Sequence, residues 1–268
     1  MGSKSGGSRS FEAKVLAGLR VVPILLFVFA LAGTSLAADR NSCVDCHSNP
    51  DFLVTNNKLY DYFQEWNASV HKLEEVECSD CHGGNPDATD AKAAHGDGVG
   101  VSDEASGIYY KNVSQTCGQC HDEILEGFEK SKHFEHVKKQ KDELQGPTCV
   151  TCHGSINVGI LDVTTVEAAC ARCHDEEHDN HPENPEKAKA ILNRFLSIHR
   201  FYRYVSIRID PSEARSFFED VDARHRQLSI TWHTFDLEQI DKETRALLGL
   251  LKEKRDELRK KSQQKKER

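Results

Sequence analysis

The chain has 268 residues with a formal net charge of −8, and only 38% of its residues are hydrophobic. A negative balance argues against nucleic acid as a partner. The hydrophobic share lies below the roughly 45–50% of ordinary globular domains, so apolar side chains alone are expected to supply too little core for the whole chain.

The first 37 residues have the layout of a secretory signal peptide. Basic residues between Lys4 and Arg20 precede an apolar stretch at 21–32, and Ser35 and Ala37 form a small-residue cleavage site. The apolar stretch is shorter than the ~20 residues of a membrane span, so an uncleaved anchor is the less favoured alternative. We therefore expect a protein exported to the periplasm or outer surface of a bacterium.

Five copies of Cys-x-x-Cys-His lie between residues 41 and 175 and use all ten cysteines. This pattern is typical of covalent attachment of c-type haem, with two thioether bonds and a proximal histidine ligand to the iron. The predicted attachment residues are Cys43, Cys46, Cys78, Cys81, Cys117, Cys120, Cys149, Cys152, Cys170 and Cys173. The predicted proximal ligands are His47, His82, His121, His153 and His174. We expect a pentahaem-binding domain over 38–184, with five covalent haems that supply the missing apolar core, and no disulfide.

The sixth ligands of these haems have to come from histidine. The only methionine is Met1, inside the predicted signal peptide, and nine histidines lie outside the motifs. An apolar stripe from Leu59 to Leu73 predicts a helix that carries His71 towards a haem. His95 follows a glycine-rich loop, and His133 is favoured over His136 on a helix after the third motif.

After Pro185 the sequence changes to three long helical stripes and a basic tail, which defines a C-terminal helical region over 185–268. Asp210 and Pro211 have the pattern of a helix start.

His199 lies beside the first stripe and is the next candidate ligand. For the fifth ligand, His181 is slightly favoured, and the alternatives left open are His178, His225 and His233. No strand pattern is present, so the predicted fold class is all-α, a multihaem cytochrome with little or no β structure.

Charge is unevenly distributed along the mature chain. Residues 39–184 carry 28 acidic and 11 basic side chains, whereas residues 185–268 carry 14 and 20. Such an asymmetry steers docking of charged partners, although a solvated acidic surface beside a solvated helical tail explains it equally well.

Two segments resemble the helix-to-haem unit of bacterial multihaem cytochromes c. One runs from Trp66 through Ser69-Val70-His71 to Cys78-Ser79-Asp80-Cys81-His82-Gly83, and the other joins Ser131-Lys132-His133 to Gly146-Pro147-Thr148-Cys149. That group includes the tetrahaem electron acceptor of hydroxylamine oxidation, pentahaem nitrite reductase and octahaem relatives. The resemblance covers about residues 41–200 and implies stacked haem pairs, with long C-terminal helices that make dimer contacts.

The chain also departs from that group. All five motifs end in histidine, whereas the pentahaem nitrite reductases carry lysine at the catalytic haem, and this chain is much shorter. Many relatives continue the fourth type of motif to a further histidine two residues after the glycine, where this chain has Ile156. The resemblance therefore leaves one haem without its expected sixth ligand.

The favoured function is electron transfer along closely packed, mainly bis-histidine haems of low potential. The expected partners are redox proteins: a membrane quinol-oxidising complex, a terminal reductase or another multihaem cytochrome. The alternative is a small reductase of nitrite, hydroxylamine or a sulfur oxyanion at a five-coordinate haem, where Arg200 and Arg203, near His199 or Tyr202, would hold the anion and supply protons. Ordinary helix surface is the favoured account of these residues.

Self-association through the C-terminal helices is a further prediction. A helical seam carries Leu237, Ile240, Leu247 and Leu251, which intrachain packing explains equally well.

Overall fold

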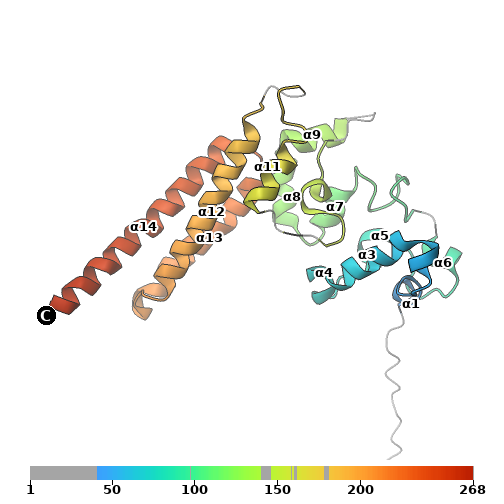
Figure 1. Cartoon of the computed structure of the whole chain (residues 1–268), viewed down its shortest axis with the longest axis horizontal. Helices are drawn as coiled ribbons and strands as arrows, with labels where there is room; N and C mark the ends of the chain where they lie inside the picture. Colours follow the sequence, from blue (N-terminus) through green and yellow to red (C-terminus); the bar gives the residue numbers. More distant parts are fainter. Residues whose placement is uncertain are drawn as a thin grey trace, which may run out of the picture. The chain divides into compact units, whose positions relative to one another are not determined.

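The computed structural model describes residues 41–96, 98–139, 146–157, 159, 162–177 and 181–267. Within these ranges all regular secondary structure is helical: fourteen helices and no strand (Figure 1). The predicted all-α class is confirmed. The predicted signal peptide lies outside the described residues, and no helix of the described part is long and apolar enough to cross a membrane.

Short helices alternate with turns through the region of the five motifs. They are α1 (Ser42–His47), α2 (Phe52–Thr55), α3 (Asn57–Asn67), α4 (Val70–Leu73), α5 (Cys78–His82), α6 (Ala91–His95), α7 (Val113–Gly118), α8 (Asp122–Glu129), α9 (Lys132–Lys139), α10 (Cys149–His153) and α11 (Val163–Cys170). Isolated helices of this length are marginal in water, so they need tertiary partners.

Three long helices follow: α12 (Asn184–Ser206), α13 (Pro211–Trp232) and α14 (Leu237–Glu267). The start of α13 is as predicted from the sequence. Asp210 is the N-cap, its side chain accepts the backbone N–H of Ser212 at 2.9 Å, and Pro211 occupies the first turn. Helix α14 packs against both α12 and α13, and α11 packs against α12 (Figure 1).

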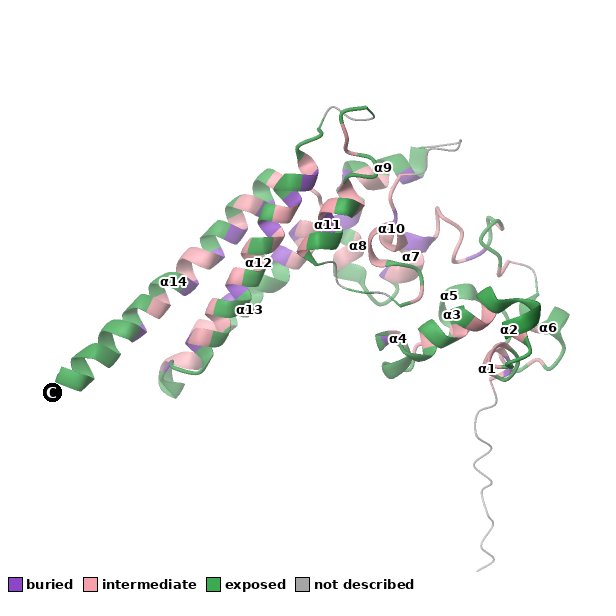
Figure 2. Ribbon diagram, viewed as in Figure 1, coloured by how far each residue is buried: buried purple, intermediate pink, exposed green. Residues whose placement is uncertain are grey.

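These long helices bury a conventional apolar core. Ile198 and Val221 pack with three leucines of α13 and α14, and a second cluster joins Val205, Ile209 and Leu258. Figure 2 shows the buried residues spread along α12, α13 and α14. Ile240, Leu247 and Leu251 of the predicted seam are 0–1% exposed within this one chain. Intrachain packing therefore accounts for them, and self-association stays a prediction.

The segment 41–112 is built differently. Its only buried residues among those described are Ser42, Ser69 and Ser106, and none of its hydrophobic side chains is buried. Val54 and Leu73 are 90% and 79% exposed. Apolar side chains thus face a volume that protein atoms do not fill, as a segment shaped around large apolar cofactors requires.

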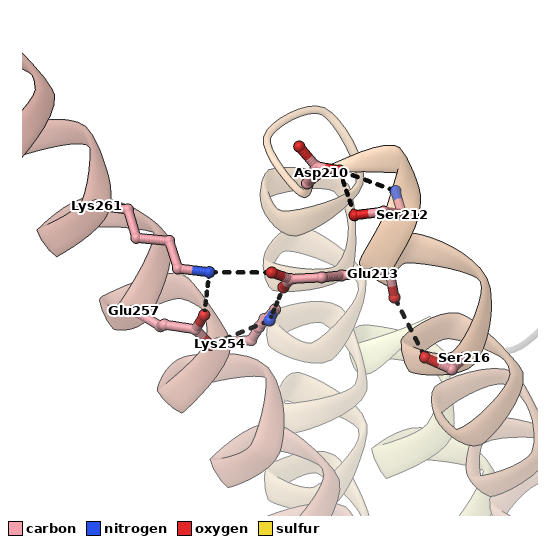
Figure 3. Close-up of polar contacts among 7 residues, drawn as sticks. All are labelled: Asp210, Ser212, Glu213, Ser216, Lys254, Glu257 and Lys261. Carbon is pink, nitrogen blue, oxygen red and sulfur yellow. Dashed lines mark hydrogen bonds and ion pairs between the residues drawn. The ribbon is translucent and has the colours of Figure 1, made fainter.

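Charged side chains join the start of α13 to α14 (Figure 3). The Glu213 carboxylate lies 2.7 Å from Lys254 Nζ and 3.1 Å from Lys261 Nζ, and Glu257 contacts both lysines. The hydrogen bonds from these lysines lower the pKa of Glu213. Because most of these groups are exposed to solvent, the ion pairs contribute little to the free energy of unfolding. We infer that they fix the register of α14 against α13.

Replacing Leu251 by alanine is expected to destabilise the bundle by about 2–5 kcal/mol, since this fully buried side chain would leave a cavity. Leu196→Ala on α12 is the matched control, because Leu196 is 46% exposed and its loss should cost less than about 0.5 kcal/mol. Urea unfolding followed by helix circular dichroism measures both. Equal losses of stability in the two variants would contradict the assignment of Leu251 to the buried core.

Candidate haem sites

Each Cys-x-x-Cys-His motif lies on one helical turn or at its end. The second and fourth motifs coincide with α5 and α10, and the first lies within α1. Side chains three and four residues apart share a helix face, so one turn brings both thiols and the histidine to the same side. Thr148 begins α10 with a capping box, in which the Thr148 N–H donates to the Thr151 hydroxyl at 3.0 Å.

The motifs are neighbours in chain order. Electrostatic coupling or hydrogen bonding links the thiols of successive motifs, through the pairs Cys43–Cys78, Cys81–Cys120, Cys117–Cys149 and Cys152–Cys173. All ten cysteines are free of disulfide bonds. Cofactors attached to these thiols would therefore lie in a continuous series from the first motif to the fifth.

The cysteines of the motifs are half-buried or exposed. Burial raises the pKa of Cys78 and of Cys170 to about 11. The Cys117 thiol donates a hydrogen bond to the Cys149 sulfur, which raises the pKa of Cys117 and lowers that of Cys149. Cys78 and Cys170 are therefore held as neutral thiols, whereas the thiolate form of Cys149 is favoured.

Four motif histidines each face a second histidine from another part of the chain. His47 faces His95 with ring centroids 6.1 Å apart, and His71 faces His121 at 6.4 Å. The other two pairs are His133 with His174 at 5.9 Å and His153 with His233 at 6.2 Å. Every pair joins segments that are far apart in sequence.

These separations fit an iron between the two rings. Metal–nitrogen bonds of about 2 Å on both sides, and about 1 Å from each nitrogen to its ring centre, place two axial imidazoles about 6 Å apart. Directly stacked or hydrogen-bonded rings would lie closer. The histidine pairs therefore have the dimensions of axial ligand pairs of haem.

Hydrogen bonds fix the ring nitrogens of three histidines in two of these pairs. The Nδ1 atoms of His95, His153 and His233 lie 2.7, 2.9 and 2.7 Å from the backbone carbonyls of Ala91, Gly159 and Ser229. A carbonyl only accepts, so Nδ1 carries the proton and the Nε2 lone pair is available. This is the arrangement in which proteins hold metal-ligating imidazoles.

Two of the paired histidines are held in the neutral form that metal binding needs. Burial lowers the pKa of His47, and the nearby His95 and His82 lower it further. Burial likewise lowers the pKa of His233; the hydrogen bond to Ser229 opposes this shift and the neighbouring His153 adds to it. Both imidazoles are thus neutral at pH 7, as axial ligands must be.

The remaining candidate ligands lie elsewhere. His199 is exposed on α12. His181 lies 3.7 Å from the Glu183 carboxylate, and the exposed His225 packs edge-on against Phe195 in the bundle. His136 is exposed on α9, next to Gly146, and His178 lies outside the described residues. No contact with a motif histidine is recorded for His181, His199, His225 or His136 in the described part of the chain.

Phe235 connects two of the histidine pairs. Its ring centroid lies 4.4 Å from that of His133 and 6.5 Å from that of His233, and it also contacts Phe128. Its φ of 56° is in the left-handed region, which is unfavourable for a bulky residue. The turn between α13 and α14 therefore places an aromatic ring between the ligand candidates of the fourth and fifth motifs.

His233 is the site residue that sequence reasoning left undecided. Ile156 stands where the resemblance implied a ligand for the fourth motif, and the fold brings His233 to His153 instead. A close helix contact makes this possible: a Cβ on Gly127 of α8 would lie 2.5 Å from the Ile230 carbonyl of α13. Neither motif spacing nor helical periodicity identifies His233 as the partner of His153.

Comparison with known proteins identifies part of the chain. Residues 103–175 match the family described as cytochrome c7 and related cytochrome c. The matched segment contains the third, fourth and fifth motifs, and the first two lie outside it. Neither the search of curated proteins nor that of solved structures found a match. The family match supports a multihaem electron-transfer cytochrome with covalently bound c-type haem.

Proposed function

We propose that the chain is an exported pentahaem cytochrome c that carries electrons through five haems arranged in the order of its motifs. The observation that carries this proposal is the set of four histidine pairs with iron-spanning separations of 5.9–6.4 Å. An enzyme active site needs open coordination, whereas paired imidazoles close both faces of an iron and favour electron transfer.

The chain's own residues define what each haem does. Bound haem supplies one-electron chemistry, and the protein sets its axial ligands, burial and spacing. The ten cysteines hold the macrocycles, the five motif histidines supply one axial ligand each, and His95, His71, His233 and His133 supply the second for the first, third, fourth and fifth motifs. Because the only methionine is Met1, inside the predicted signal peptide, none of these haems is expected to have the His/Met ligation that raises the potential.

The order of motifs defines two ends for electron entry and exit. Thiols of successive motifs are neighbours, so electrons pass from the first motif to the fifth or in reverse. Acidic side chains dominate residues 39–184 by 28 to 11. We infer that redox partners, among them a quinol-oxidising membrane complex and a terminal reductase or another multihaem cytochrome, dock through basic surfaces.

A potentiometric titration of the purified haem protein, followed by absorption and EPR spectra, tests the proposal. We expect most of the iron to be low-spin and all potentials to lie well below those of His/Met cytochromes, because two imidazoles stabilise the oxidised iron. Potentials in the His/Met range, or mostly high-spin iron, would contradict it.

One observation favours the reductase as a second candidate. His82 faces no second histidine ring among the described residues, so the second motif is the one that leaves an axial position open. Of the anion-holding residues considered from the sequence, Tyr202 packs on Phe218 at 4.8 Å and interacts with Asp222 in the bundle, whereas Arg200 and Arg203 are exposed on α12. Turnover of nitrite by the reduced protein, above that of free haem, would establish this candidate.

A further inference from the structure

His82 differs from the other four motif histidines. Those four each have a partner ring at 5.9–6.4 Å, whereas His82 has no ring contact within the described ranges and is exposed at the end of α5. His82 is close enough to His47 to influence its pKa, but His47 already faces His95. A haem held by the second motif would thus have one axial ligand from the part of the chain that the structure describes.

The loop that follows α6 runs alongside the second motif. A Cβ on Gly84 would meet the Ala94 carbonyl at 2.6 Å and Val99 at 3.4 Å, and a Cβ on Gly107 would meet the Cys81 carbonyl at 2.6 Å. The Asn112 side chain donates to the carbonyls of Glu104 and Ser106 at 2.8 and 2.9 Å. The loop is therefore tied to the second motif at both ends.

This loop offers no strong ligand for iron. Gly96 and residues 98–104 line a shallow hollow, and its polar side chains are Ser102, Asp103 and Glu104. The surrounding segment 74–104 carries nine carboxylates and a single lysine, Lys92. Any ligand that approaches the second motif along this loop meets a field of negative charge.

We propose that the haem of the second motif keeps one axial position open and binds small uncharged ligands, such as nitric oxide or hydroxylamine, in preference to oxyanions. The inference rests on the proposed haem binding and adds a ligand-binding site to it. Because like charges repel, each carboxylate near the open position disfavours an anion. Neutral ligands do not experience this repulsion.

The position of the second motif suits such a site. Its two thiols lie next to those of the first and third motifs, through Cys43 and Cys120 respectively. Electrons can therefore reach it from both sides through haems whose ligand pairs are complete. A ligand-binding haem inside an electron-transfer series couples ligand occupancy to electron flow.

The first experiment uses the wild-type protein with all five haems. We expect a high-spin EPR signal from about one fifth of the iron, and a carbon monoxide-induced absorption change of the reduced protein with the same stoichiometry. Nitric oxide and hydroxylamine should abolish the high-spin signal at lower concentration than nitrite or sulfite. Fully low-spin iron that is inert to carbon monoxide would overturn the inference and leave the electron-transfer proposal standing.

A second measurement locates the site. The double variant Asp103→Asn, Glu104→Gln keeps the size of both side chains, and Asn still accepts the N–H of Ala105. We expect it to bind nitrite about threefold to tenfold more tightly while its affinity for carbon monoxide is unchanged. The matched control is Asp122→Asn, Glu123→Gln, an exposed acidic pair next to His121 of the third motif. An equal effect in the control, or none in either variant, would place the open iron elsewhere and overturn the assignment.

Discussion

His233→Ala is expected to convert one of five haems from low-spin to high-spin iron that binds carbon monoxide. His233 is the only side chain recorded opposite His153 within the described residues, at 6.2 Å, and its Nδ1 atom is held by the Ser229 carbonyl. In the proposed arrangement, removing it would open the far face of the fourth haem, while attachment through Cys149 and Cys152 would remain. EPR spin quantification and carbon monoxide difference spectra measure the change, which should add about one fifth of the iron to any signal of the wild type.

Two further variants make this result specific. His225→Ala removes an exposed histidine from the same helix and should leave every spectrum unchanged. His233→Met should restore low-spin iron and raise the potential of a single haem, because thioether ligation favours the reduced state. A wild-type spectrum for His233→Ala would show that the fourth haem takes its sixth ligand from elsewhere.

Without haem, residues 41–112 are expected to exchange their amide hydrogens as an unfolded chain does, while α12–α14 stay protected. The N-terminal segment buries no hydrophobic side chain among its described residues, so it has nothing to offset the entropy of ordering. The three long helices share the cluster around Val221 and Leu251, which are both 0% exposed. Hydrogen exchange with mass spectrometry on the chain produced without haem attachment measures both regions.

The holo protein is the control for this experiment, and there both regions should be protected. Protection of residues 41–112 in the haem-free chain would show that this segment has a core of its own. Loss of protection in α12–α14 would show instead that the bundle depends on the haem region, through contacts such as that of α8 with α13.

How much the sequence predicts depends on how local each interaction is. The attachment sites are local, since one helical turn brings the cysteines and the histidine together. The C-terminal stripes repeat with helical periodicity and pack on one another, so α12, α13 and α14 follow from the sequence. The stripe from Leu59 to Leu73 predicts one helix, but the structure divides it into α3 and α4, because the Ser69 side chain caps a new helix start. Its apolar side chains are at most half-buried.

The second ligands are non-local, and periodicity contains no information about them. His71, His95 and His133 were candidates because each lies on a short helix beside a motif, and the fold places each against the histidine of a different motif. His199 and His181 had equally suitable local surroundings, yet they lie on exposed surfaces. The path of the chain through α8 and α13, which brings His233 to His153, depends on tertiary contacts such as Gly127 against Ile230.

The histidine pairs also bear on the timing of biogenesis. Three of the pairs are complete once the ribosome has made the fifth motif: His47–His95, His71–His121 and His133–His174. The partner of His153 is His233, which is made only after α13. Because synthesis proceeds from the N-terminus, the fourth haem is the last of these four to gain its second ligand. In the proposed arrangement, a polypeptide truncated before residue 233 would therefore mature with one more reactive iron than the full chain, so that reactivity towards carbon monoxide would report whether the C-terminal helices are complete.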